Sequence, residues 1–216
     1  SAGFITLGKV EDINRAIVKI GLKNLHSILL ASNARKILES RYSRFEEIWD
    51  HCGKVAFYSK TIAQKFRMND IAKNAYITRL LHDIGKVILL AADLNTVKQI
   101  AEIVKNREII NANVMEEISI GISHAEIGAL VAEKWNFPDY MAATIKHHHS
   151  PLLLPEKFRD IAYSVYLANM ICGIEKRNYY YYYIEESVLE RFGISSEAEF
   201  VKLHEYLTAE YNKKPK

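Results

Sequence analysis

The spacing of apolar residues constrains the fold of this sequence more than any other feature. Between residues 77 and 91, apolar side chains recur at intervals of three and four, the period of one buried helix face. Only 9 glycines and 4 prolines occur among the 216 residues, so long helices meet few interruptions. The sequence therefore predicts an all-α fold, a compact bundle of many helices with a small helical extension at its C-terminus.

Breaker and capping residues divide the helix-period pattern into segments. One helix is expected to begin after Asn69 or Asp70 and to run without a break through residues 79–90, and Ser123 is expected to cap another. The other predicted helices are 10–20, 24–39, 44–66, 95–106, 114–118, 124–135, 139–148, 156–174, 185–192 and one after Ser195 or Ser196. The tyrosine-rich run 178–184 is the only strand-like stretch, and without a partner strand it is expected to form a loop or a packed aromatic segment.

The net charge, the longest apolar run and the cysteine pattern exclude several classes of protein. The net charge of +3 is too small and too evenly spread to indicate nucleic-acid binding. The longest apolar run, 87–92, is far too short to cross a bilayer. Cys52 and Cys172 stand alone, outside any CxxC pattern, which is typical of a reducing compartment. We therefore expect a cytoplasmic protein that contacts neither a membrane nor nucleic acid.

A histidine–aspartate doublet, His82-Asp83, interrupts the apolar stripe of one predicted helix and is followed by Gly85. Two interpretations are open. Asp83 could form a surface ion pair with Arg79 or Lys86, with His82 as a core histidine, or the doublet could belong to a site. Glycine costs about 1 kcal/mol relative to alanine inside a helix, so we expect Gly85 to allow close approach of a neighbouring segment.

Most of the histidines lie on separate predicted helices and could converge if these helices form a bundle. His51, His82, His124, His148 and His149, together with Asp83, are the candidate metal ligands, with Glu47 and Asn169 as weaker candidates. Imidazole and carboxylate suit Zn, Mn, Fe or Ni, and a bridging aspartate suits two metals. Alternatively, His124 could be an exposed residue at a helix start. His147 is interpreted as a solvated helix end, and His26 and His204 as surface residues.

Four segments resemble the HD superfamily and, more closely, its HDOD branch, the HD-related output domain of bacterial signalling proteins. They are "HCGKVA" (51–56), "LLHDIGK" (80–86), "HAEIGALVAEKWNFPDYMAATIKHHHSP" (124–151) and "VYLANMI" (165–171). The resemblance extends from the first residue to about residue 195. It implies that 1–40 is the end of an N-terminal helical subdomain, 41–178 the HD-like core and 179–216 the helical extension.

The resemblance also implies a ligand set. The metal ligands of HD proteins correspond to His51, His82, Asp83, His124, His148 and His149, and to a final aspartate where this chain has Asn169. Glu47 matches a further ligand of the cyclic-dinucleotide phosphodiesterase branch. That branch also carries a "GYP" segment where this chain reads "SPLLLPE", which argues against hydrolysis of cyclic di-GMP.

Two functions follow from the resemblance. The first is a signalling output module that binds other signalling proteins without turnover, with or without a bound metal. The alternative is a phosphohydrolase that acts on a nucleotide or another phosphoester with one or two divalent ions, Fe, Mn, Zn or Ni. In the alternative, Lys86 is the catalytic residue that neutralises the phosphate.

Overall fold

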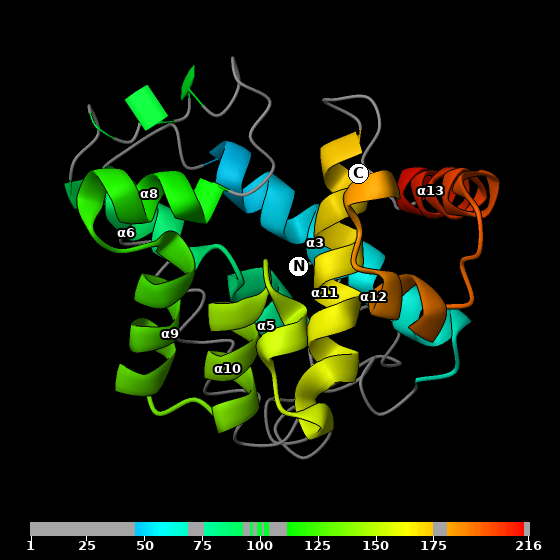
Figure 1. The fold of residues 1–216 in the computed structure, drawn as a ribbon, viewed down its shortest axis with the longest axis horizontal. Helices are drawn as coiled ribbons and strands as arrows, with labels where there is room; N and C mark the ends of the chain where they lie inside the picture. Colours follow the sequence, from blue (N-terminus) through cyan, green and yellow to red (C-terminus); the bar gives the residue numbers. More distant parts are fainter. Residues whose placement is uncertain are drawn as a thin grey trace, which may run out of the picture.

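The computed structural model describes residues 46–68, 76–92, 96, 99–100, 102–103, 112–174 and 181–213. All regular secondary structure in this part of the chain is helical, which confirms the predicted all-α class (Figure 1). The predicted helices 10–20 and 24–39, most of 95–106 and the expected cap at Asn69 or Asp70 lie outside the described residues. Within them, no helix has both the length and the apolar character needed to cross a bilayer.

Two long helices lie at the centre of the fold. Helix α3 (Glu46–Lys65) packs along α11 (Glu156–Ile174), and both have nearly the bounds that the sequence predicts (Figure 1). The apolar positions of α3 are buried as its period requires, among them Cys52, Val55 and Ile62. At the contact between the helices, Ser59 Oγ donates a hydrogen bond of 2.8 Å to Ser164 Oγ. This pair of helices separates two apolar cores.

The remaining helices pack on either side of this pair. One core joins α3 and α11 to α12 (Glu186–Arg191) and α13 (Glu197–Asn212), and the other joins α3 to α5 (Tyr76–Leu81), α6 (Ile84–Ala92), α9 (His124–Lys134) and α10 (Asp139–His147). Helix α8 (Ala112–Ile120) contacts α9, and the 3-10 turn η2 (Pro151–Leu153) connects α10 to α11. In the tyrosine run, Tyr181–Tyr183 forms a single 3-10 turn, η3, rather than a strand.

The predicted unbroken helix through residues 79–90 was wrong. Helix α5 ends at Leu81 and α6 begins at Ile84, so that His82 and Asp83 form the turn between two helices. The side chain of His82 stabilises this turn because its Nδ1 donates to the carbonyl of Arg79, at 2.8 Å, in the last turn of α5. His82 and Asp83 therefore lie between two helices and not on the face of one continuous helix.

Gly85 explains how this turn comes to face α9. A Cβ atom at Gly85 would lie 1.8 Å from the carbonyl oxygen of His124 and 2.9 Å from the backbone nitrogen of Gly128. A Cβ at Gly128 would in turn lie 2.8 Å from the Cγ2 of Ile145. The expected close approach is confirmed: Gly85 lets α6 meet the backbone of α9, which brings Asp83 next to the first residue of α9, while Gly128 leaves room for Ile145 of α10.

Candidate metal centre

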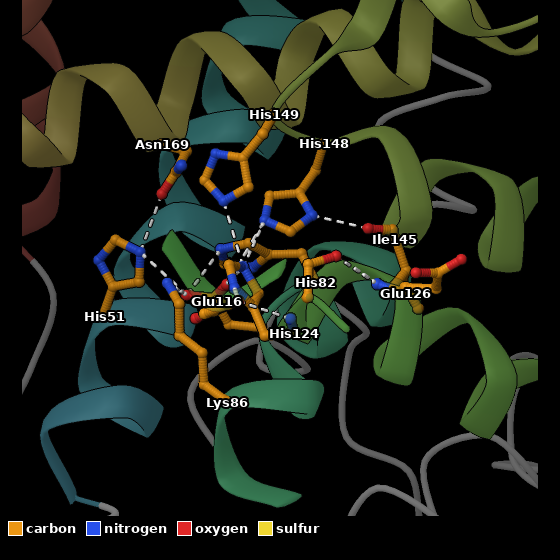
Figure 2. Close-up of polar contacts among 12 residues, drawn as sticks. His51, His82, Lys86, Glu116, His124, Glu126, Ile145, His148, His149 and Asn169 are labelled. Carbon is orange, nitrogen blue, oxygen red and sulfur yellow. Dashed lines mark hydrogen bonds and ion pairs between the residues drawn. The ribbon is translucent and has the colours of Figure 1, made fainter. Parts of the chain in front are cut away.

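Six predicted site residues come from four parts of the fold and meet at one place (Figure 2). His51 projects from α3, and His82 and Asp83 lie in the turn between α5 and α6. His124 is the first residue of α9, and His148 and His149 follow the end of α10. The side chains of His82, Asp83, His124 and His148 are buried. Whether these residues bind a metal ion stays a prediction, but their geometry can be examined directly.

One oxygen of Asp83 faces two imidazoles, and a third imidazole lies beside them. Asp83 Oδ1 lies 3.2 Å from the Nε2 of His124 and 3.4 Å from the Nε2 of His148. His149 joins this set, because its Nε2 is 3.2 Å from that of His124. The four potential ligand atoms all lie within 4.8 Å of one another. We refer to Asp83 Oδ1, His124, His148 and His149 as the Oδ1 group.

The other oxygen of Asp83 has different neighbours. Asp83 Oδ2 lies 3.5 Å from the Nε2 of His82 and 3.6 Å from that of His51, and these three residues form a second set of potential ligands. The same oxygen accepts a hydrogen bond of 2.7 Å from the Lys86 ammonium. His51 Nε2 is also 2.9 Å from the amide oxygen of Asn169. We refer to Asp83 Oδ2, His51, His82, Lys86 and Asn169 as the Oδ2 group.

Solvent reaches the two groups unequally. The side chains of His51 and Lys86 are 27% and 30% exposed, whereas those of His124 and His148 are fully buried. The centre is therefore closed around His82, His124 and His148, and solvent reaches it at His51, Lys86 and, in part, His149.

The hydrogen bonds of three imidazoles determine where their protons lie. The Nδ1 atoms of His82 and His148 lie 2.8 Å and 2.7 Å from the carbonyl oxygens of Arg79 and Ile145, and the Nδ1 of His124 lies 2.7 Å from the Glu116 carboxylate. Carbonyl and carboxylate oxygens only accept hydrogen bonds, so each Nδ1 carries the proton. In the neutral form of each imidazole, Nε2 then presents a lone pair toward Asp83.

A cluster of lone pairs around a carboxylate is unfavourable without a positive partner. His82 Nε2 and Asp83 Oδ1 are both buried and make no hydrogen bond within the described part of the chain. A buried acceptor that makes no hydrogen bond costs about 1–3 kcal/mol. A divalent cation between these atoms would supply the missing partner, and neutral imidazole with carboxylate is a donor set that Zn, Mn, Fe and Ni accept. The residues therefore fit a metal ion.

The protonation states agree with this reading. Burial lowers the pKa of His82 to about 3, and it also lowers the pKa of His148 and, well below its usual value, that of His149. Burial alone would raise the pKa of Asp83, but the neighbouring Lys86 ammonium holds that pKa well below its usual range. At neutral pH His82, His148 and His149 are thus neutral and Asp83 is ionised, the forms in which these groups bind metals.

The structure decides several alternatives that the sequence leaves open. The interpretation of Asp83 as part of a surface ion pair was wrong, because its side chain is only 1% exposed. Lys86 does pair with Asp83, within the centre rather than on the surface. His124 is buried, not exposed.

The weaker candidates lie farther out. Glu47 is exposed and belongs to neither set of potential ligands among the described residues. Asn169 contacts His51, with its amide oxygen 2.9 Å from Nε2 of that imidazole. His147 is partly buried at the end of α10 and also lies outside both sets.

Sequence reasoning missed Glu116, which lies on α8. Its carboxylate accepts from both the backbone nitrogen and the Nδ1 of His124, at 2.6 Å and 2.7 Å, and only 6% of the residue is exposed. Residues 114–118 showed only a weak helical pattern, and no motif connects Glu116 with a histidine eight positions later. A buried carboxylate of this kind becomes recognisable only when its partner is seen.

The fold and its histidine–aspartate centre define a helical domain of the HD type. The model of the HDOD domain family matches residues 1–151, so the chain belongs to the HDOD family, as its motifs indicated. Its similarity to individual proteins is more distant. An uncharacterised protein of Treponema pallidum (strain Nichols) is 29% identical over 197 residues, which cover 91% of this chain and 38% of the relative. The chain thus spans well under half of that relative.

Solved structures share the fold. A proposed phosphohydrolase from Shewanella amazonensis SB2B superimposes with a TM-score of 0.63 at 21% identity, covering 93% of this chain and 73% of the other. A proposed signal transduction protein from Marinobacter aquaeolei VT8 superimposes with a TM-score of 0.62 at 17% identity, covering 97% and 49%. At these identities the similarity establishes the fold and leaves the activity open.

Proposed function

We propose that this HDOD domain is a signalling output module built around a divalent metal ion, and that it acts by binding another signalling protein without turnover. One observation supports a bound metal ion. The imidazole Nε2 atoms at the start of α9 and after the end of α10 converge on the carboxylate of Asp83 in the α5–α6 turn. A metal held there would link three segments of the fold. Its binding energy would then add to the stability of the arrangement that a partner recognises.

The Oδ2 group supports the absence of turnover. Hydrolysis by two metals requires a second cation about 3.5–4 Å from the first. Here the Lys86 ammonium already lies 2.7 Å from Asp83 Oδ2, and the neutral amide of Asn169 stands where HD enzymes have a carboxylate. A second cation would face one positive neighbour and one uncharged ligand. The relative named as a proposed signal transduction protein agrees with a signalling role.

Metal analysis combined with a hydrolysis assay tests this proposal. The chain is purified without chelators, its metal content is measured, and it is incubated with bis-p-nitrophenyl phosphate and with nucleotides in the presence of Mn²⁺ or Fe²⁺. We expect bound metal and no hydrolysis above the level of a His82→Ala/Asp83→Ala double variant. Hydrolysis that depends on metal and is lost in the double variant would overturn the absence of turnover, and a chain without affinity for metal would overturn the metal centre.

A metal-dependent phosphohydrolase is the second candidate, and the position of Lys86 favours it. Its ammonium is partly exposed on the open side of the centre, where it could bind a phosphate oxygen while remaining next to Asp83. A bound divalent ion supplies a water of lowered pKa as the nucleophile. The relative named as a proposed phosphohydrolase agrees with this alternative. Absence of activity with added Mn²⁺ or Fe²⁺ would count against it.

A further inference from the structure

We propose that Glu116 is a positioning residue for the metal ligand His124. This inference rests on the metal centre of the proposed function and adds a residue from α8 that does not reach the ligand cluster itself. Glu116 Oε2 accepts two hydrogen bonds from His124, 2.6 Å from the backbone nitrogen and 2.7 Å from Nδ1. Both residues are buried, so this pair is shielded from water (Figure 2).

The place of His124 in the fold explains why it depends on a partner from another element. His82 and His148 follow the ends of helices, and each bonds through Nδ1 to the carbonyl three residues earlier. His124 instead begins a helix, and the residues before it form a bend, not a helical turn. The residue three positions before His124 is Gly121, which lies in a bend, so no helix carbonyl is available to the Nδ1 of His124. The carboxylate of Glu116 accepts that hydrogen bond instead.

Helix capping explains only one of the two hydrogen bonds to Glu116: the backbone N–H of His124 is one of the free N–H groups at the start of α9, whereas its ring Nδ1 is not. Ser123 already caps α9, since its Oγ accepts from the backbone nitrogen of Glu126 at 3.3 Å. Among the described residues, Glu116 forms hydrogen bonds only to His124, and one of them reaches Nδ1, the ring nitrogen that does not face Asp83. A carboxylate at this position fixes the tautomer, orients the ring and makes Nε2 a stronger donor.

Charge distinguishes His124 from the two comparable ligands. His82 and His148 donate to neutral carbonyls, whereas His124 donates to an anion. Glu116 therefore adds a second negative charge behind the Oδ1 group, in addition to that of Asp83. We infer that His124 is the strongest imidazole donor of these three.

The decisive variant is Glu116→Gln. One oxygen of Glu116 accepts both hydrogen bonds, so glutamine can retain both while it loses the charge. We expect the melting temperature of the metal-free protein to stay close to that of the parent chain, while its affinity for Zn²⁺, measured by competition with a chelator, falls about 10–100-fold. Glu116→Ala should lose more affinity and also stability. Glu117→Gln, an exposed neighbour on α8, is the matched control and should change neither quantity.

Cobalt spectroscopy separates positioning from a merely structural role. At saturating Co²⁺, we expect Glu116→Gln to show d–d absorption bands shifted from those of the parent chain, because the donor strength of His124 has changed. This measurement reports on the metal-bound form alone, so it remains informative if the metal-free variant is less stable. Parent-like affinity together with a parent-like spectrum would overturn the role of Glu116 and leave the metal centre standing. A parent chain that binds neither Zn²⁺ nor Co²⁺ would overturn both.

Discussion

The two oxygens of Asp83 face different surroundings, although they belong to one carboxylate. Around Oδ1, the protein places buried imidazole lone pairs. Around Oδ2, it places the Lys86 ammonium at 2.7 Å and the imidazoles of His82 and His51, the latter also in contact with Asn169. One side therefore lacks a positive partner, and the other already has one. The comparison indicates that affinity for a metal ion is concentrated in the Oδ1 group.

Asp83 belongs to both groups, so its replacement has the largest expected effect. We predict that Asp83→Asn retains no metal after gel filtration, because the only carboxylate among the potential ligands of both sets loses its charge. Elemental analysis measures this directly. Asp160→Asn is the control, since Asp160 forms an exposed ion pair with Arg191 elsewhere. Retention of metal by Asp83→Asn would mean that the carboxylate is not the shared element of the two groups.

The packing that brings the Oδ1 group together is tested at Gly85. We expect Gly85→Ala to lower the free energy of unfolding by about 3 kcal/mol or to prevent folding, because the added methyl group would collide with the backbone of His124. Gly53→Ala on α3 is the control: nothing lies within 4 Å of its Cβ position, and alanine should stabilise the helix by up to about 1 kcal/mol. Denaturant unfolding measures both. A Gly85→Ala variant with the same free energy of unfolding as the parent chain would contradict the close contact between α6 and α9.

Two single histidine variants compare the groups directly. His124→Ala should weaken metal binding more than about 100-fold, the upper range for loss of a partner that only supports a ligand, because it removes a fully buried donor of the Oδ1 group itself. His51→Ala should weaken it by no more than about 10-fold, since His51 is partly exposed and also contacts Asn169. Calorimetric titration with Zn²⁺ gives both constants. Equal losses would show that the two oxygens of Asp83 contribute alike.

The smallest effect concerns pH and the metal-free protein. Burial lowers the pKa of His82 to about 3, whereas the unfolded residue takes up a proton near pH 6.5. Below pH 6.5 the unfolded state binds more protons than the folded state, so stability falls as the pH falls. His82 alone should cost about 1.4 kcal/mol for each pH unit between 6.5 and about 3, and the lowered pKa values of His148 and His149 act in the same direction.

Urea unfolding at pH 7, 6 and 5 with a chelator present measures this slope. His82→Gln should make the slope of stability against pH shallower by the equivalent of about one proton. A variant at His204, which lies on α13 outside both sets, should leave the slope unchanged. A stability that stays constant between pH 6.5 and 5 would contradict the neutral, buried state of the imidazoles.

Local features explain which parts of the fold could be predicted. Helix α11 has the predicted bounds, and Ser196 caps α13 as one of the two predicted candidates, because periodicity and capping depend on neighbouring residues. The turn at His82-Asp83 was missed because it follows from contacts between distant segments. In particular, Gly85 packs against the backbone of His124, which no local pattern encodes.

The sequence by itself determined the helical class, the family and the identity of six residues that meet in the centre, because these depend on residue type and spacing. Only the tertiary structure decided how those residues work together. It set the proton positions through Arg79, Ile145 and Glu116, and it joined His51 to Asn169, 118 positions away. Burial and the direction of a hydrogen bond arise where segments pack, so the unequal surroundings of the two Asp83 oxygens exist only in the folded chain.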